Sequence, residues 1–194
     1  SMSVRGIIRK SNVKLICTTD DPVDDLRYHK QLAEDPTWEL KVLPAWRPDK
    51  AVNIDQATFV PYIAQLSQVS GVAISDFASL KQALEKRLDF FGEMGCVASD
   101  HGLDSAFYCP ASEEEVDAIL KAALAGKEIT PSDALKYKTE ILLFFARQYA
   151  KRGWVMQLHY GAVRNTNRRM FEKLGPDTGF DCMGSTLDAV AITR

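Results

Sequence analysis

A histidine and an arginine follow an apolar run towards the end of the chain. His159 lies at the end of residues 154–160, and Arg164 follows five residues later, beyond Gly161. Histidine can exchange a proton near neutral pH, and arginine presents a planar fork of N–H donors to a carboxylate or a phosphate. The pattern predicts a buried strand that ends in a loop equipped for proton transfer and for binding an anion.

Two earlier segments repeat this arrangement. Arg47 lies between Trp46 and Pro48, where the backbone is stiff and extended. Asp100 and His101 follow an apolar run, in a position that can hold a general acid or base. Ligands of parallel α/β proteins bind beyond the carboxyl ends of the strands. The three strand ends therefore predict one composite site, and its two arginines favour an anionic ligand.

Each of these residues also has a structural interpretation, which the sequence leaves open. His159 can be a satisfied structural histidine, Arg164 can pair with a surface acid, and Asp100 can bond its own backbone in a turn. For residues 18–22, Thr-Thr-Asp-Asp-Pro, capping of the following helix is favoured over catalysis. His29, inside the next helical stretch, is interpreted as a surface or packing residue.

Several kinds of site are not supported by the sequence. The three histidines form no HxH or HExxH pattern, and carboxylates are not grouped with them at ligand spacing. The chain contains no GxGxxG or GxxxxGK(S/T) motif and no nucleophile elbow. We therefore expect no metal ligand, phosphate-binding loop or nucleophilic serine or cysteine within this chain.

Composition places the chain among soluble globular proteins. Apolar residues make up 46% of it, and its formal net charge of -2 argues against a nucleic-acid binder that neutralises phosphates. No apolar stretch approaches the roughly 20 residues that span a bilayer, and the N-terminus lacks a signal-peptide core. The four cysteines form no CxxC pair, which favours reduced thiols. We expect a cytoplasmic protein that binds neither nucleic acid nor membrane.

Alternating strand and helix patterns must position the polar groups. Short apolar runs followed by polar turns predict strands over residues 13–18, 40–46, 96–99 and 154–160. Apolar spacing, caps and proline or glycine signals predict helices over residues 22–34, 57–68, 76–91, 112–124, 130–152 and 168–174. This alternation implies parallel strands with right-handed crossovers, and hence an α/β fold.

The chain length of 194 residues fits a single α/β domain, residues 1–194. Residues 1–2, Ser-Met, are interpreted as an expression-tag remnant followed by the start, and residues 165–194 as a weakly patterned tail. A complete (β/α)8 barrel takes about 250 residues, and only four strands are predicted here. The chain therefore accommodates half a barrel or a small open sheet.

Four motifs, in this order along the chain, resemble the uronate isomerase family. They are CTTDDP at residues 17–22, AWRPDK at 45–50, SDHG at 99–102 and LHYGAVRN at 158–165. Each motif is weak alone, whereas the set is specific. The resemblance implies a partial (β/α)8 TIM-type barrel of the amidohydrolase superfamily, with about four parallel strands. It also implies interconversion of D-glucuronate with D-fructuronate and of D-galacturonate with D-tagaturonate.

The resemblance also assigns roles, which we take as hypotheses. Arg47 and Arg164 would bind the substrate, orienting the uronate carboxylate and hydroxyls. Asp100 and His159 would be catalytic, assisting proton movement as an enediol forms between C1 and C2. The family uses a divalent metal such as zinc, through an upstream HxH pair and a downstream aspartate that are absent from this chain. We therefore expect a central fragment of the barrel that has no isomerase activity alone.

Two other classes of function compete with this interpretation. One is a metal-dependent, amidohydrolase-like hydrolase. The other is a non-catalytic α/β module that binds an anionic sugar or a protein partner. A cut barrel would leave unpaired sheet edges, which favours self-association into a homo-oligomer.

Overall fold

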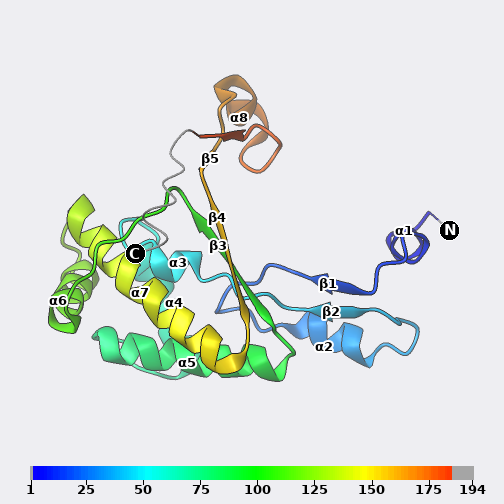
Figure 1. The fold of residues 1–194 in the computed structure, drawn as a ribbon, viewed down its shortest axis with the longest axis horizontal. Helices are drawn as coiled ribbons and strands as arrows, with labels where there is room; N and C mark the ends of the chain where they lie inside the picture. Colours follow the sequence, from blue (N-terminus) through cyan, green and yellow to red (C-terminus); the bar gives the residue numbers. More distant parts are fainter. Residues whose placement is uncertain (1, 185–194) are drawn as a thin grey trace.

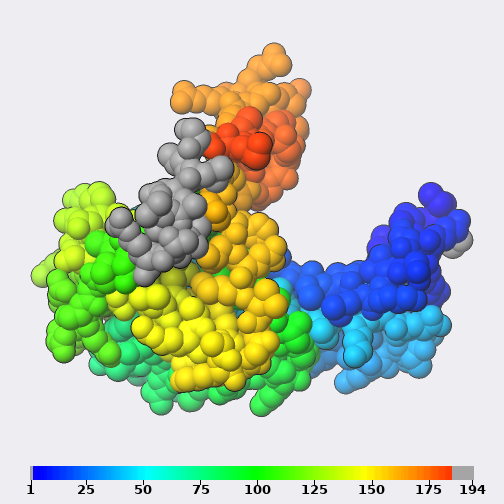
Figure 2. Space-filling view, in the orientation of Figure 1, coloured from blue at the N-terminus to red at the C-terminus, as the bar shows by residue number. Residues whose placement is uncertain are grey.

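The computed structural model of this α/β protein describes residues 2–184 of the 194-residue chain. Strands β3 and β4 cross the middle of the molecule, and helices α4 to α7 gather on one side of them (Figure 1). Strands β1 and β2 extend away with α2 as an arm that ends at α1. The β5–α8 end and the N-terminal arm project from the helical body (Figure 2).

The four longer strands run parallel, as the alternation of strands and helices predicts. β1 (Leu15–Cys17) pairs with β2 (Lys41–Leu43), and β3 (Ala98–Leu103) pairs with β4 (Val155–Tyr160). Isolated parallel bridges from Trp46 to Asp20 and from Trp46 to Ser99 connect the two pairs. The α/β class is thus confirmed, in the form of short parallel sheets.

Six helices correspond to predicted ones, with ends that shift by a few residues. They are α2 (Arg27–Glu34), α4 (Phe59–Ser70), α5 (Phe77–Glu93), α6 (Glu113–Leu124), α7 (Pro131–Arg152) and α8 (Arg168–Leu174). The sequence did not indicate the short elements α1 (Val4–Lys10), α3 (Asp49–Val52), β5 (Ala162–Val163) and β6 (Cys182–Met183). α3, β5 and β6 have only two to four residues, too few to show a period. None of the helices among residues 2–184 is long and apolar enough to cross a membrane.

Local capping signals are confirmed at two helices and wrong at a third. Ser112 forms a reciprocal capping box with Glu115 at the start of α6, and Thr130 caps α7. Residues 18–22, in contrast, do not cap α2, because that helix begins five residues later. Its N-cap is Leu26, a left-handed residue whose side chain makes no cap. The polar groups of residues 18–20 are used for tertiary contacts instead.

The hydrophobic core lies between helices α4 to α7 and includes Trp46, which is fully buried. The Trp46 ring packs edge-on against Phe91 of α5, with 4.9 Å between ring centroids, and against Phe145 of α7 at 6.1 Å. Because Trp46 is anchored on two helices, the backbone of Arg47 is held at the edge of the core.

The prediction that residues 154–160 form a buried strand is wrong. β4 alternates between exposed and half-buried side chains, and Val155 is 66% exposed. Within residues 2–184, β4 pairs only with β3, so one of its edges and much of one face have no protein cover. Its apolar composition is that of a strand covered on both faces, and residues 2–184 do not provide that cover.

Candidate functional site

The structure brings together three of the four predicted site residues. Nη2 of Arg47 lies 2.8 Å from Oδ2 of Asp100, and Nε2 of His159 lies 2.8 Å from Oδ1 of the same carboxyl. Arg47 follows β2, while Asp100 and His159 lie in β3 and β4. The three side chains therefore converge on one place as predicted, although Asp100 lies inside β3 and not beyond its end.

Backbone pairing fixes this convergence. The N–H of Trp46 donates to the carbonyl of Ala98 at 3.1 Å, and the N–H of Asp100 donates back to the carbonyl of Trp46 at 2.8 Å. The N–H of Arg47 donates to the carbonyl of Asp20 at 2.9 Å. Arg47 and Asp100 therefore extend from backbone segments that are hydrogen-bonded in the manner of parallel strands. The separation between the Cα atoms of these two residues is set by the spacing of neighbouring strands.

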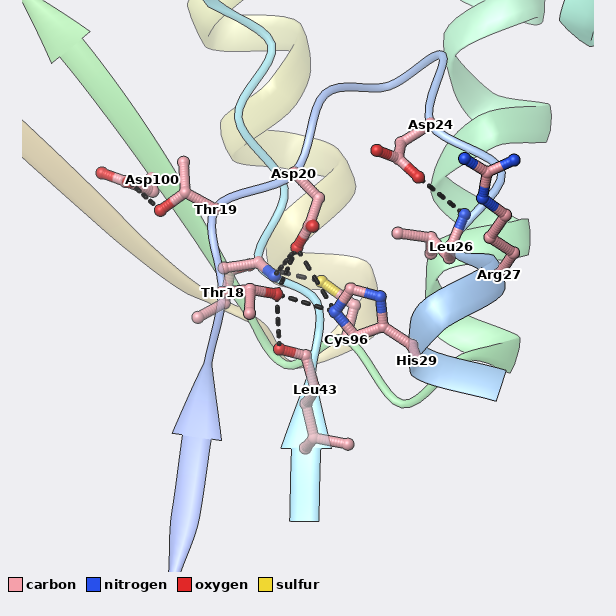
Figure 3. Close-up of polar contacts among 12 residues, drawn as sticks. Thr18, Thr19, Asp20, Asp24, Leu26, Arg27, His29, Leu43, Cys96 and Asp100 are labelled. Carbon is pink, nitrogen blue, oxygen red and sulfur yellow. Dashed lines mark hydrogen bonds and ion pairs between the residues drawn. The ribbon is translucent and has the colours of Figure 1, made fainter. Parts of the chain in front are cut away.

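Asp100 is the centre of the cluster, and its side chain is only 11% exposed. A carboxylate buried to this degree needs polar partners, and it has them. Besides Arg47 and His159, the hydroxyl of Thr19 donates to Oδ2 at 3.1 Å (Figure 3). His159 approaches Oδ1 closely but without hydrogen-bond geometry, so that contact is electrostatic when the imidazole is protonated. Asp100 is therefore not a turn aspartate bonded to its own backbone.

A second polar cluster lies behind Thr19. Oδ2 of Asp20 accepts the hydroxyl of Thr18 at 2.6 Å and the N–H of Ala45 at 3.2 Å. Nε2 of His29, on α2, lies 2.7 Å from the same Thr18 hydroxyl (Figure 3). His29 is buried, so of its two predicted interpretations the structure shows packing. This cluster ties α2, β1 and β2 together and holds the loop that presents Thr19 to Asp100.

A cavity of about 520 Å³ opens beside the cluster. That volume lies in the range of small-molecule sites, about 300–1,000 Å³. Its polar lining consists of Arg47, Asp49, Asp104, His159, Tyr160 and Arg164. Arg47, His159 and Arg164 therefore line one cavity, and Asp100 lies next to it, in contact with Arg47 and His159.

Arg164 lines the cavity, but its guanidinium is paired elsewhere. Nη1 lies 2.6 Å from Oδ2 of Asp181, whose other oxygen accepts the N–H of Asn165 at 3.0 Å. The Arg164 side chain is 54% exposed. The structure thus shows the alternative in which a loop arginine pairs with a surface acid. A ligand can still bind, because among residues 2–184 the guanidinium donates one hydrogen bond, from Nη1 to Asp181.

His101, adjacent to Asp100 along β3, points away from the cavity. Its ring is completely buried, and Nε2 lies 3.0 Å from the hydroxyl of Tyr149. Burial lowers the pKa of His101 to about 4, against the opposing effect of the Asp100 charge. The imidazole is therefore neutral at pH 7 and belongs to the aromatic packing between β3 and α7.

Asp49 is a site residue that the sequence did not reveal. Its two carboxyl oxygens lie 3.1 and 3.2 Å from the N–H of Gly102, which donates to them, and Oδ2 lies 3.7 Å from Nε of Arg47. Burial raises the pKa of Asp49, while the Gly102 N–H and the charge of Arg47 lower it. Its position two residues after Arg47, in the AWRPDK motif, was the signal that could have identified it.

The arrangement suits an oxygen-rich anion and proton exchange with it. His159 is 52% exposed, so a ligand in the cavity can reach its imidazole, while Oδ1 of Asp100 lies 2.8 Å from Nε2 on the other side. The site does not suit a metal ion. Within residues 2–184 no three His, Cys, Asp or Glu side chains are placed to ligate one, and Asp100 is engaged by Arg47, Thr19 and His159.

Comparison with known proteins gives a consistent result. The whole chain, residues 1–194, matches the family model described as UxaC, glucuronate isomerase. Uronate isomerases of Lachnospira eligens and Lachnoclostridium phytofermentans are 51% and 52% identical to it over 185 and 184 residues. Each of these alignments covers 95% of this chain and 40% of the relative. The chain therefore spans about 40% of the length of these curated relatives.

Solved structures agree with the sequence matches. A crystal structure of uronate isomerase from Thermotoga maritima superposes with a TM-score of 0.90 at 33% identity, covering 97% of this chain and 42% of that one. A crystal structure of glucuronate isomerase from Caulobacter crescentus superposes with a TM-score of 0.86 at 26% identity, covering 98% and 39%. The fold described above is thus similar to about 40% of each of these structures.

Proposed function

Because this chain belongs to the glucuronate isomerase family, we propose that the full-length product of its gene isomerises hexuronates between aldose and ketose forms. The family match confirms the resemblance to this family that the four motifs predicted. The proposed reactions convert D-glucuronate to D-fructuronate and D-galacturonate to D-tagaturonate. One observation supports the proposal most: Asp100 lies between Arg47 and the accessible imidazole of His159, beside a cavity of about 520 Å³.

An aldose-to-ketose conversion moves hydrogen without net oxidation. A proton leaves C2 and a proton arrives at C1, while the O2 hydroxyl becomes a carbonyl and the O1 carbonyl becomes a hydroxyl. An enediol lies between the two sugars. The reaction therefore needs groups that exchange protons and groups that stabilise charge on the two oxygens.

The residues of this site fit those tasks. His159 is accessible to a ligand and can exchange a proton with a sugar oxygen or carbon. Asp100 is fixed behind it, with Oδ1 2.8 Å from Nε2 of His159. The guanidinium of Arg47 reaches both Asp100 and the cavity, so it can also donate to a substrate oxygen.

Arg164 is proposed to bind the uronate carboxylate. Its contact with Asp181 leaves four N–H donors of the fork without that partner, so a substrate carboxylate can share the guanidinium with Asp181. An exposed ion pair of this kind has a small net stability, about 0–1 kcal/mol. Competition by a bound substrate is therefore energetically feasible.

A divalent metal is part of the proposal only for the full-length protein. In the described part of this chain the donor set does not fit a metal site. We therefore derive no chemical step from it and place its ligands outside this chain. For the same reason the 194-residue chain alone is proposed to be inactive.

The four parallel strands are proposed to be part of a (β/α)8 barrel, in which further strands would cover β4. The expected cytoplasmic location and homo-oligomer remain predictions.

Product identification tests the proposed function. The purified full-length protein is incubated with D-glucuronate or D-galacturonate, and the products are separated by chromatography and identified by NMR. We expect the corresponding ketouronates from the native protein and a large rise in KM for Arg164→Ala. Absence of ketouronate, or hydrolysis of an added ester or amide substrate instead, would refute the function. Unchanged turnover and affinity in Arg164→Ala would refute the role of Arg164.

A further inference from the structure

Asp49 connects two parts of the site that are far apart in sequence. It is the first residue of α3, and its carboxylate accepts the N–H of Gly102, at the end of β3 and 53 residues away. α3 itself is firmly anchored. Ala51 and Val52 are buried, and the carbonyl of Ala51 accepts the hydroxyl of Tyr137 on α7 at 2.7 Å. The carboxylate of Asp49 is therefore a fixed point between the core and the cavity.

Asp49 contacts β3 closely at a glycine, Gly102. A Cβ added to Gly102 would lie 3.0 Å from Oδ2 of Asp49, closer than real Cβ contacts usually are. With a Cβ there, Asp49 or β3 would have to move by a few tenths of an ångström, which would disturb the approach of the Gly102 N–H to the two carboxyl oxygens at 3.1 and 3.2 Å. Gly102 lies opposite His159 in the register of β3 and β4. Fixing Gly102 therefore also fixes the strand position that faces His159.

The same carboxylate lies at the guanidinium of Arg47. Its Oδ2 is 3.7 Å from Nε of Arg47, within ion-pair range but too far for a direct hydrogen bond. Nε is buried and has no hydrogen-bond partner among the described residues. Arg47 is thus held by two carboxylates at different nitrogens, Asp100 at Nη2 and Asp49 at Nε. Two such contacts restrict rotation of the guanidinium, whereas one would leave it free to turn.

We infer that Asp49 is a positioning residue of this site, which clamps the end of β3 through Gly102 and orients the guanidinium of Arg47 by its charge. It acts on the substrate through Arg47 and β3. The clamp on β3 is a property of the fold, while the effect on turnover rests on the proposed function. The two consequences are tested by different variants of the full-length protein.

Hydrogen exchange tests the clamp on β3 without reference to activity. Asp49→Ala removes the acceptor of the Gly102 N–H, whereas Asp49→Asn keeps a side-chain oxygen that can accept it. Exchange of the peptide covering residues 98–103 is followed by mass spectrometry. We expect the Gly102 amide to exchange about tenfold faster in Asp49→Ala and to keep its protection in Asp49→Asn. Native protection in Asp49→Ala would overturn the clamp.

A double-mutant cycle tests the action through Arg47. Asp49→Asn keeps the shape and the Gly102 contact but removes the charge at Nε. We expect it to lower kcat/KM for D-glucuronate about tenfold, because small misplacements of a binding group are costly in turnover. In an Arg47→Lys background, which lacks Nε and the planar fork, the same substitution should cost less than about twofold. An equal loss in both backgrounds, or no loss in the native one, would overturn the inference.

Asp55→Asn is the matched control. Asp55 is an aspartate six residues further on that pairs with Lys138 at 2.8 Å and has no contact with the site. For Asp55→Asn we expect native turnover and native exchange at residues 98–103. A loss of kcat/KM equal to that of Asp49→Asn would overturn the inference. If the native full-length protein forms no ketouronate, the proposed function fails. The exchange of Asp49→Ala then decides the inference alone.

Discussion

Replacing Thr19 by valine removes one hydroxyl from behind Asp100 and leaves the shape of the side chain almost unchanged. The hydroxyl donates to Oδ2 of Asp100 at 3.1 Å, and Asp100 keeps its contacts with Arg47 and His159. A hydrogen bond to a charged group contributes about 1.5–3 kcal/mol. We take the lower end, because the donor distance is long for O–H···O and Arg47 remains at the same oxygen.

A loss of about 1.5 kcal/mol in fixing Asp100 corresponds to about a tenfold fall in kcat. The assay is the initial rate of ketouronate formation from D-glucuronate by the full-length protein. Thr19→Ser returns the hydroxyl and should recover most of the rate. Thr37→Val is the matched control, since Thr37 donates to the carboxylate of Asp35 at 2.6 Å on the exposed surface. Native kcat in Thr19→Val, no recovery in Thr19→Ser, or an equal loss in Thr37→Val would refute the reasoning.

Two further predictions concern stability, and both are measured by urea unfolding. Gly102→Ala places a methyl group 3.0 Å from Oδ2 of Asp49 and should lower the free energy of unfolding by about 1–3 kcal/mol. The control is Gly92→Ala in α5, where the nearest atom would lie at 3.7 Å and no stability should be lost. Equal stabilities of the two variants would refute the close contact. The pKa of His101 is lowered from 6.5 to about 4 by burial, so the unfolded chain takes up the proton first and stability falls as the pH drops from about 6.5 to 4. His101→Gln should remove that part of the pH dependence, and an unchanged pH dependence would contradict a buried neutral imidazole.

Local signals explain what the sequence predicted correctly. The capping box at Ser112 and the proline after Thr130 act within one helical turn, so the sequence itself contains both partners of each contact. The ends of parallel strands meet at one edge of a sheet, which is why Arg47, Asp100 and His159 could be grouped from the sequence alone. Family membership was predictable for a different reason, since four motifs typical of the family occur together in the family's order along the chain.

The features that the sequence missed depend on partners far along the chain. Thr19 contacts Asp100 across 81 residues, and Asp49 contacts Gly102 across 53. The Thr-Thr-Asp-Asp-Pro segment has the composition of a helix cap, and only the tertiary structure shows that its side chains serve β2, α2 and Asp100. The exposure of β4 was missed because its apolar pattern is typical of a strand covered on both faces, whereas among residues 2–184 it pairs with β3 alone.

Turnover by the Asp100→Asn variant of the full-length protein is the most direct test of the central claim, that the residues gathered at these strand ends form the uronate site. Asparagine keeps the size of Asp100 but removes the charge that lies against Arg47 and His159. We predict that kcat for D-glucuronate falls at least about 100-fold while the unfolding midpoint stays close to native, because Arg47 and His159 lose the carboxylate that holds them beside the cavity. Native turnover in Asp100→Asn would contradict the account.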